Sequence, residues 1–188
     1  CIRDRAVRAQ LFLGALQGIL TLDADYAFAD TAYRIDTRWR EFPVGAFLPQ
    51  EDLGLLSLSL SAQGCGFDPF SDRMRADLAL YVDTLDYGGY RFNDLGLDAA
   101  LDSGIVSAHI LGVDSAVRLD LNLAGRLSPS EYTAHLAGEI DWLDLKTARF
   151  TDDSLTFSSS VDIRAWANDK NEYSVKTRFD ICLLYTSP

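Results

Sequence analysis

The alternation that decides the fold is clearest in Leu56-Ser57-Leu58-Ser59-Leu60-Ser61-Ala62-Gln63. Each apolar residue in this stretch is followed by a polar one. Successive side chains of a β-strand point to opposite sides of the sheet, so a period of two gives the strand one apolar face and one polar face. The stretch therefore predicts a strand of an antiparallel sheet with one face toward water.

The same alternation recurs on both sides of this stretch, for example in residues 76–82 and 117–123. Turn-forming residues such as Tyr87-Gly88-Gly89 separate the runs. We expect about ten strands of roughly ten residues each, on the order of 33 Å when extended. They cover residues 7–16, 19–28, 32–42, 53–63, 75–85, 90–101, 105–112, 116–126, 132–143, 155–166 and 173–181, with Arg149–Asp153 beginning the last strand pair.

One segment breaks the alternation, Phe42-Pro43-Val44-Gly45-Ala46-Phe47-Leu48-Pro49. Two prolines bracket an apolar pentad in it. Proline lacks the N–H group that a sheet ladder needs. We therefore expect a short plug here, one helical turn that covers an edge or end of the sheet.

The predicted fold class is all-β, with long antiparallel amphipathic strands. Strands longer than the usual five or six residues, with no helices, suit a wide and curved sheet. Such a sheet can curl into an open trough (a β-taco) whose apolar floor holds an apolar ligand. It can also fold over into a closed β-sandwich with a filled interior. The alternation fits both.

Composition narrows the possible partners. The chain has 188 residues, with 17 basic and 28 acidic side chains and a formal net charge of −11. This balance argues against nucleic acid and anionic membrane surfaces as direct partners. The acidic residues are spread along the strands, which is typical of a solvated outer face.

The chain is expected to be an internal piece of a longer, repeat-like protein. Residues 1–181 are interpreted as a single elongated β unit. Residues 182–188, Cys-Leu-Leu-Tyr-Thr-Ser-Pro, are expected to be a non-native tail, because they resemble the translation of a sequencing adapter. An internal repeat of about 58 residues is also expected, with units near 76–126 and 132–181. Seven residues are identical to the residue that lies 58 positions later in the chain. They are Asp83, Leu85, Asp86, Arg91, Phe92, Asp94 and Leu97.

The sequence offers no motif for catalysis, a cofactor or a metal. The histidines His109 and His135 lie within strand patterns without a metal-spaced partner. Of the three cysteines, only Cys65 is distant from the chain ends, and it is interpreted as a small residue in a glycine-rich turn. Acidic pairs such as Asp152-Asp153 are expected to cap turns. We therefore predict a protein that is not an enzyme.

Several segments resemble a known family. They are the run from Phe42 to Pro49, the segment Gly64-Cys65-Gly66-Phe67-Asp68-Pro69-Phe70-Ser71, and Leu85-Asp86-Tyr87-Gly88-Gly89-Tyr90-Arg91-Phe92. With the strands between them, they resemble the repeated β region of the TamB family. That family belongs to the AsmA-like group of bacterial inter-membrane proteins. The resemblance covers Asp36 to about Asp169.

The resemblance implies a long protein that is anchored in the inner membrane of a Gram-negative cell and crosses the periplasm. It implies a trough-shaped sheet with an apolar lining and a role, within a translocation and assembly module, in phospholipid transport toward the outer membrane and in outer-membrane biogenesis. It thus favours the open trough over the sandwich. The implied partners are phospholipid acyl chains and, through regions outside this chain, outer-membrane assembly proteins.

Residues of the alternating runs are the candidate lipid lining. They are Leu56, Leu58, Leu60, Leu78, Leu80, Val82, Leu119, Leu121, Leu123, Leu136 and Ile140. A closed core would use the same residues, so a structural or adhesive β-sandwich domain that binds protein partners without lipid stays an alternative. A third possibility is a carbohydrate-active protein that uses Tyr87, Tyr90 and Trp142 as exposed aromatic platforms.

Overall fold

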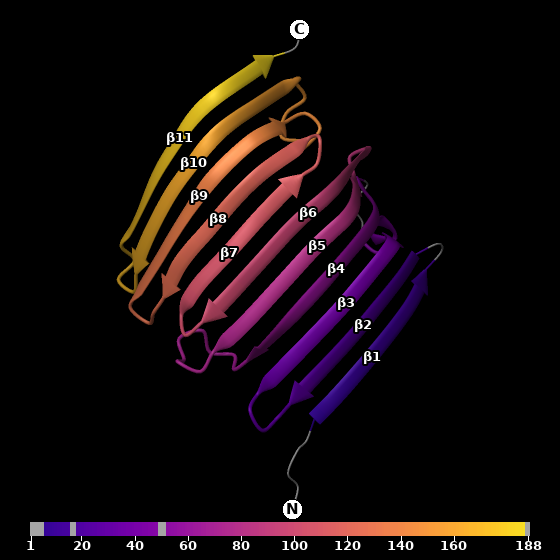
Figure 1. Ribbon diagram of the computed structural model, residues 1–188, viewed down its shortest axis with the longest axis vertical. Helices are drawn as coiled ribbons and strands as arrows, with labels where there is room; N and C mark the ends of the chain where they lie inside the picture. Colours follow the sequence, from indigo (N-terminus) through magenta and orange to yellow (C-terminus); the bar gives the residue numbers. More distant parts are fainter. Residues whose placement is uncertain (1–5, 16–17, 49–51, 187–188) are drawn as a thin grey trace, which may run out of the picture.

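The chain forms a single-layered sheet of eleven antiparallel strands that follow one another in chain order (Figure 1). The computed structural model describes residues 6–15, 18–48 and 52–186, and all structural statements concern these residues. Cys1, Pro49 and the last two residues of the tail therefore lie outside the described part. The strands are β1 (Ala6–Ala15), β2 (Gly18–Ala27), β3 (Ala32–Pro43), β4 (Leu53–Cys65), β5 (Arg75–Tyr87), β6 (Tyr90–Asp102), β7 (Ile105–Val113), β8 (Val117–Leu127), β9 (Glu131–Asp144), β10 (Leu155–Asn168) and β11 (Tyr173–Thr186).

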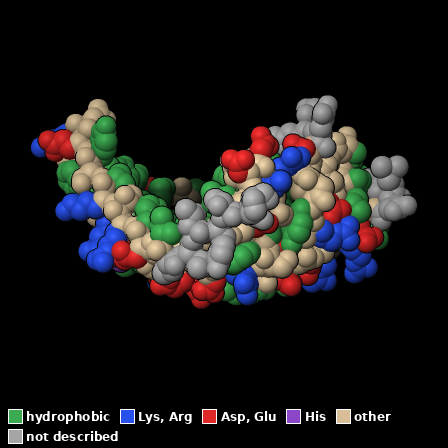
Figure 2. All heavy atoms as spheres, turned by 90° about the horizontal axis from the view of Figure 1, so that it is seen from above, with side chains coloured by type: hydrophobic (Ala, Val, Ile, Leu, Met, Phe, Trp, Pro, Cys, Tyr) green, Lys and Arg blue, Asp and Glu red, His purple; other side chains and the backbone are tan. Residues whose placement is uncertain are grey.

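The open, curled sheet confirms the predicted all-β class. No second layer covers either face within the described residues, so the chain does not form the closed sandwich that the alternation also allowed. Seen from above, the molecule has a crescent-shaped profile (Figure 2). Charged side chains gather on its convex side, and hydrophobic side chains are visible in the hollow. We call the hollow apolar side the inner face and the convex polar side the outer face.

The interior of the molecule is small because a single layer cannot bury its side chains against a second one. Only five apolar residues in the described part are buried, namely Phe42, Met74, Phe92, Ala116 and Val161. Stability must therefore come mainly from the ladders and from side-chain pairs across neighbouring strands.

A line of bulges crosses the sheet. In β3 the register shifts between Trp39 and Phe42, where Glu41 has a φ of +47°. In β5, Asp83 is skipped between the pairs Leu58–Val82 and Ser57–Thr84. A bulge inserts one residue and bends the strand.

The same irregularity continues in two further strands. Asp94 of β6 lies opposite Asp83, is left out of the ladder and has a φ of +54°. Asp141 of β9 is the extra, unpaired residue of a bulge between the pairs Leu119–Ile140 and Arg118–Trp142. The bulges in β3, β5 and β9, and Asp94 in β6, all lie one or two residues beyond one cross-strand row, which consists of Trp39, Leu58, Val82, Leu95, Gly112, Leu119 and Ile140. They therefore crease the sheet along one line, which contributes to its curvature.

The predicted plug is present as one turn of 3₁₀ helix, η1 (Val44–Ala46). It begins directly after Pro43, the last residue of β3. The turn brings Phe47 back onto Phe42, with the two rings stacked and their centroids 5.2 Å apart. Phe42 also contacts Trp39 of β3, at 5.3 Å between the centroids. The plug therefore covers one end of the inner face.

The expectation of a strand at Arg149–Asp153 is wrong, because these residues belong to the loop between β9 and β10. The Asp144 carboxylate accepts hydrogen bonds from the backbone N–H groups of Lys146 and Thr147, at 3.1 and 3.0 Å. Such a turn competes with strand formation. Arg149 has a φ of +64°, which also ends the extended conformation.

A buried carboxylate fixes the turn between β7 and β8. Asp114 is 4% exposed and accepts hydrogen bonds from Tyr90 Oη at 2.9 Å and from the backbone N–H groups of Asn93 and Ala116, at 3.0 and 2.7 Å. Burial alone would raise the pKa of Asp114, but these donors outweigh burial and lower it below its ordinary value of 3.8. The ionised carboxylate therefore ties the β7–β8 turn to the first residues of β6.

We predict that Asp114→Asn destabilises the protein by about 2 kcal/mol at pH 7, because it leaves donors without a charged acceptor. Since folding lowers the pKa of Asp114, its contribution is fully present above the ordinary value and is lost as the pH falls through the lower folded value. Urea unfolding from pH 7 down to pH 3 should thus show the two proteins converging below about pH 4. The exposed Asp98→Asn is the matched control, and a constant difference at all pH values would contradict the prediction.

Candidate functional site

The inner face forms because the register sets apolar residues opposite one another. Leu60 of β4 pairs with Leu80 of β5, and Leu123 of β8 pairs with Leu136 of β9. Residues directly opposite in a ladder project from the same face of the sheet. The register therefore joins the apolar halves of all the strands into one surface.

The eleven residues predicted as a lipid lining all lie on this inner face. In addition to the pairs above, Leu58 faces Val82, and Leu119 faces Ile140. All eleven side chains are half-buried, since the neighbours on their own face cover only their sides. A closed core would bury most of them.

One row of residues crosses the whole inner face. Its members, from β1 to β11, are Leu11, Leu22, Thr37, Leu60, Leu80, Leu97, Ile110, Leu121, Gly138, Val161 and Phe179. With neighbouring strands about 4.8 Å apart, the row is roughly 50 Å long. It forms a continuous apolar floor along the trough.

Two hydroxyl groups on the inner face are satisfied within the protein. Thr37 Oγ1 donates to the backbone oxygen of Thr21 and accepts from Trp39 Nε1, both at 2.8 Å. Ser159, which is 1% exposed, donates from Oγ to the backbone oxygen of Ser160 at 2.8 Å. These hydroxyls therefore do not require water or a polar ligand on the floor.

Aromatic side chains stand at both ends of β3 on the inner face. At one end are Trp39, Phe42 and the plug. At the other end, Phe67 from the loop after β4 stacks on Tyr33, with centroids 5.5 Å apart. These rings are not predictable as part of the site from the alternation alone, because the contact between Phe67 and Tyr33 depends on the path of the loop after β4. Tyr33 and Trp39 are an even number of residues away from the apolar residue Ile35. The alternation therefore could have placed both rings on the inner face.

The strand ends form the two rims of the trough. Between β4 and β9, the loops on each rim contact one another. On one rim, Arg149 Nη2 lies 3.1 Å from Asp52 Oδ1, and the Asp52 carbonyl accepts the Gly88 N–H at 2.8 Å. On the other rim, Phe70 contacts Tyr132 of β9, with centroids 6.2 Å apart. The section from β4 to β9 is thus braced at both ends of its strands.

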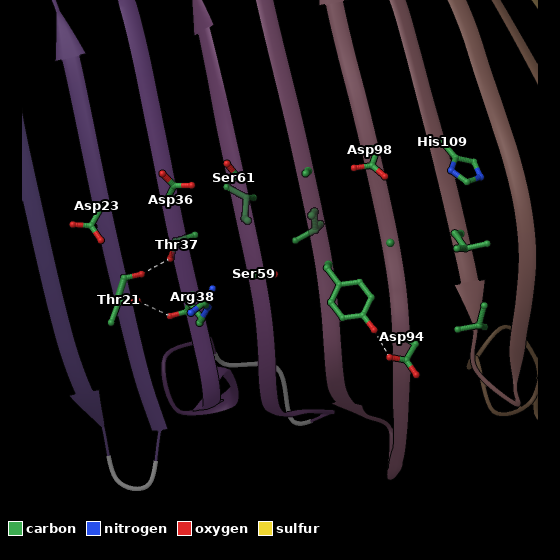
Figure 3. A pocket seen from close by; sticks show the side chains of 17 residues that line it. Thr21, Asp23, Asp36, Thr37, Arg38, Ser59, Ser61, Asp94, Asp98 and His109 are labelled. Atoms are coloured by element: carbon green, nitrogen blue, oxygen red, sulfur yellow. Dashed lines mark hydrogen bonds between the residues drawn. The ribbon is translucent and has the colours of Figure 1, made fainter.

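The outer face carries a hollow of about 920 Å³ that is lined by both polar and apolar residues (Figure 3). Asp23 and Asp36 lie directly opposite each other in it. Hydrogen bonds from Arg34, at 2.6 Å, and from Ser61 lower the pKa of Asp36. Tyr81 donates a hydrogen bond to Asp94, which raises the pKa of Tyr81. The acidic side chains of the hollow therefore already have hydrogen-bond partners at Asp36 and Asp94.

Both histidines are on the outer face beside a carboxylate. His109 Nε2 lies 2.8 Å from Asp120 Oδ1, and His135 Nε2 lies 3.3 Å from Asp162 Oδ1. Burial tends to raise the pKa of Asp162, but Arg164 and His135 lower it overall. In the described residues, no group of three histidine, cysteine, aspartate or glutamate side chains could hold a metal ion.

The aromatic residues proposed as sugar platforms are less open than predicted. Tyr87, Tyr90 and Trp142 are each half-buried rather than exposed. The Tyr90 hydroxyl already bonds to Asp114 and lies 2.8 Å from Ser115 Oγ. Cys65 is a free thiol at the end of β4, with Sγ 3.2 Å from the Arg73 carbonyl oxygen.

The rim tie predicts different effects for two adjacent glycines, both with positive φ. A Cβ atom at Gly88 (φ +60°) would lie 2.4 Å from Arg149 Nε, whereas one at Gly89 (φ +82°) would meet nothing within 4 Å. We expect Gly89→Ala to cost about 1 kcal/mol from backbone strain alone. Gly88→Ala should cost more, because it also displaces Arg149 from Asp52.

Urea unfolding of both variants, each also in an Arg149→Ala background, measures this difference. The excess cost of Gly88→Ala should disappear in that background, where the displaced side chain is absent. Equal costs for the two glycine variants in the native background would show that the tie is unimportant.

Within the described residues, no helix is long and apolar enough to span a membrane. Comparison with known proteins finds no family model, no curated protein and no solved structure that matches this chain. The inner face and the outer hollows are therefore interpreted from their own chemistry.

Proposed function

We propose that the inner face holds the acyl chains of phospholipids, as one section of a TamB-like conduit. The observation that carries this proposal is the uncovered apolar row that crosses all eleven strands. Such a surface exceeds what a soluble monomer ordinarily leaves open to water. An acyl chain lying along it gains about 0.8 kcal/mol for each CH₂ group removed from water.

The chemistry of the inner face supports an aliphatic ligand. The inner-face positions of β4 and β8 are occupied mainly by leucine, with alanine, valine and glycine, and none is charged. The hydroxyls of Thr37 and Ser159 are bonded internally, so these two offer a headgroup no free partner. In this mechanism acyl chains slide along the floor, and the headgroups remain in water at the mouth between the two rims.

The wider role follows the same proposal. The section would belong to a protein of the periplasm that is anchored in the inner membrane through regions outside this chain. It would pass phospholipid toward the outer membrane and contact outer-membrane assembly proteins through other regions. Neither role requires a catalytic residue. The adhesive-domain alternative needs a second layer over the inner face, and the described residues supply none.

Adjacent positions on β5 provide the test. Leu80 lies on the inner face and Ala79 on the outer face. We predict that the chain co-purifies with phospholipid from a bacterial periplasm or membrane extract and that Leu80→Asp removes the lipid, because a carboxylate repels an apolar ligand. Ala79→Asp, which adds the same charge to the outer face, should retain it. Native mass spectrometry measures the bound lipid.

Circular dichroism and urea unfolding show whether each variant is folded. Since Leu80 is only half-buried, Leu80→Asp should keep the sheet. A native chain that stays lipid-free when phospholipid is offered would refute the proposal. Lipid retention by a folded Leu80→Asp variant would also refute it.

A further inference from the structure

A second hollow on the outer face is lined on two sides by arginines. Its volume is about 500 Å³. Ser57 and Thr84 line it and lie directly opposite each other in β4 and β5. Arg38 and Arg40 from β3 line one side, and Arg91 from β6 lines the other. The short side chains of Ser57 and Thr84 lie between longer ones and so create the depression. Six of the lining side chains carry N–H or O–H donors, one of them the indole of Trp39.

Two of these guanidinium groups have no ion-pair partner among the residues that the structure describes. Within the described residues, neither Arg38 nor Arg40 lies within ion-pair distance of a carboxylate. Most other arginines do have such a partner, namely Arg8, Arg34, Arg75, Arg91, Arg149, Arg164 and Arg178. Two neighbouring arginines without an ion pair have guanidinium groups that are available to an anionic ligand.

The other donors are held in place. The Asp86 carboxylate binds Arg91 through Nε at 2.6 Å and Nη2 at 2.9 Å, which leaves Nη1 without this partner. Ser57 Oγ accepts the Glu41 N–H at 3.0 Å, so its own proton is available to an acceptor. Guanidinium and hydroxyl groups together are the donors that phosphate oxygens prefer.

Carboxylates also line the same hollow. They belong to Glu41 and Asp83, the extra residues of the bulges in β3 and β5. They would repel a bare phosphate dianion. A ligand with an ammonium group next to its phosphate matches both signs of charge.

We propose that this hollow binds a phosphate ester that carries a neighbouring ammonium group. Arg38 and Arg40 bind the phosphate oxygens, with Arg91 and the Ser57 hydroxyl as further donors. Glu41 and Asp83 receive the ammonium group. The site lies on the opposite face from the acyl-chain floor, so it is independent of the proposed function.

Isothermal titration of the full chain with O-phosphoethanolamine, inorganic phosphate and ethanolamine tests the site. We expect O-phosphoethanolamine to bind, and the two partial ligands to bind at least tenfold more weakly. The double variant Arg38→Gln/Arg40→Gln should lower the affinity for O-phosphoethanolamine at least tenfold. The matched control is Arg118→Gln/Arg126→Gln, which removes two exposed arginines without an ion pair from β8.

Absence of O-phosphoethanolamine binding would overturn the proposal. An equal loss in the control variant would also overturn it, because the effect would then come from net charge. Equal affinity for inorganic phosphate would overturn the role of the two carboxylates. Leu80→Asp should leave the affinity unchanged, and Arg38→Gln/Arg40→Gln should leave the co-purified lipid unchanged, so failure of one proposal does not affect the other.

The ligand group can come from a free metabolite or from a lipid headgroup, and vesicles distinguish the two. Co-sedimentation with phosphatidylethanolamine vesicles that is lost in Arg38→Gln/Arg40→Gln supports the site with a headgroup as the source. Binding of soluble O-phosphoethanolamine without vesicle binding supports the site with a free ligand.

Discussion

The register between neighbouring strands is the constraint on which the rest of this molecule depends. A slip of one residue in any pair would turn the apolar side chains of one strand to the outer face and its charged side chains to the inner face. The strand pairs set most apolar positions opposite apolar positions, and the register shifts at a few local irregularities along the strands. Because no second layer covers the sheet in the described part of the chain, this lateral matching alone makes the apolar surface continuous.

The bulges reconcile this matching with curvature. Each adds a residue without changing which side chains face inward, because apolar residues on either side of it are three positions apart instead of two. Val82 and Leu85 flank Asp83 in this way, and Ile140 and Leu143 flank Asp141. The extra residues Asp83 and Asp141, like Glu41 in β3, are acidic and exposed. The chain therefore bends its strands at positions where the additional side chain can remain in water.

Much of the fold could be predicted from the sequence because period two is a local rule. The positions of Leu58, Leu80 and Leu121 on one face follow from it directly. The ion pair between Asp52 and Arg149 could not be predicted, since it joins loops 97 residues apart. The strand expected at Arg149–Asp153 failed because the Asp144 carboxylate bonds to the backbone and favours a turn. The grouping of Arg38 with Arg91 likewise needed the order of the strands.

The simple order of the sheet has a consequence for how such a protein can change in length. Each strand pairs only with its neighbours in the chain, so the energy of the sheet is close to a sum of nearest-neighbour terms. Inserting or deleting one hairpin with matched alternation would lengthen or shorten the trough by about 10 Å. The cross-section would stay the same. The span of such a trough is therefore adjustable in hairpin-sized steps, without redesign of the surface that it offers.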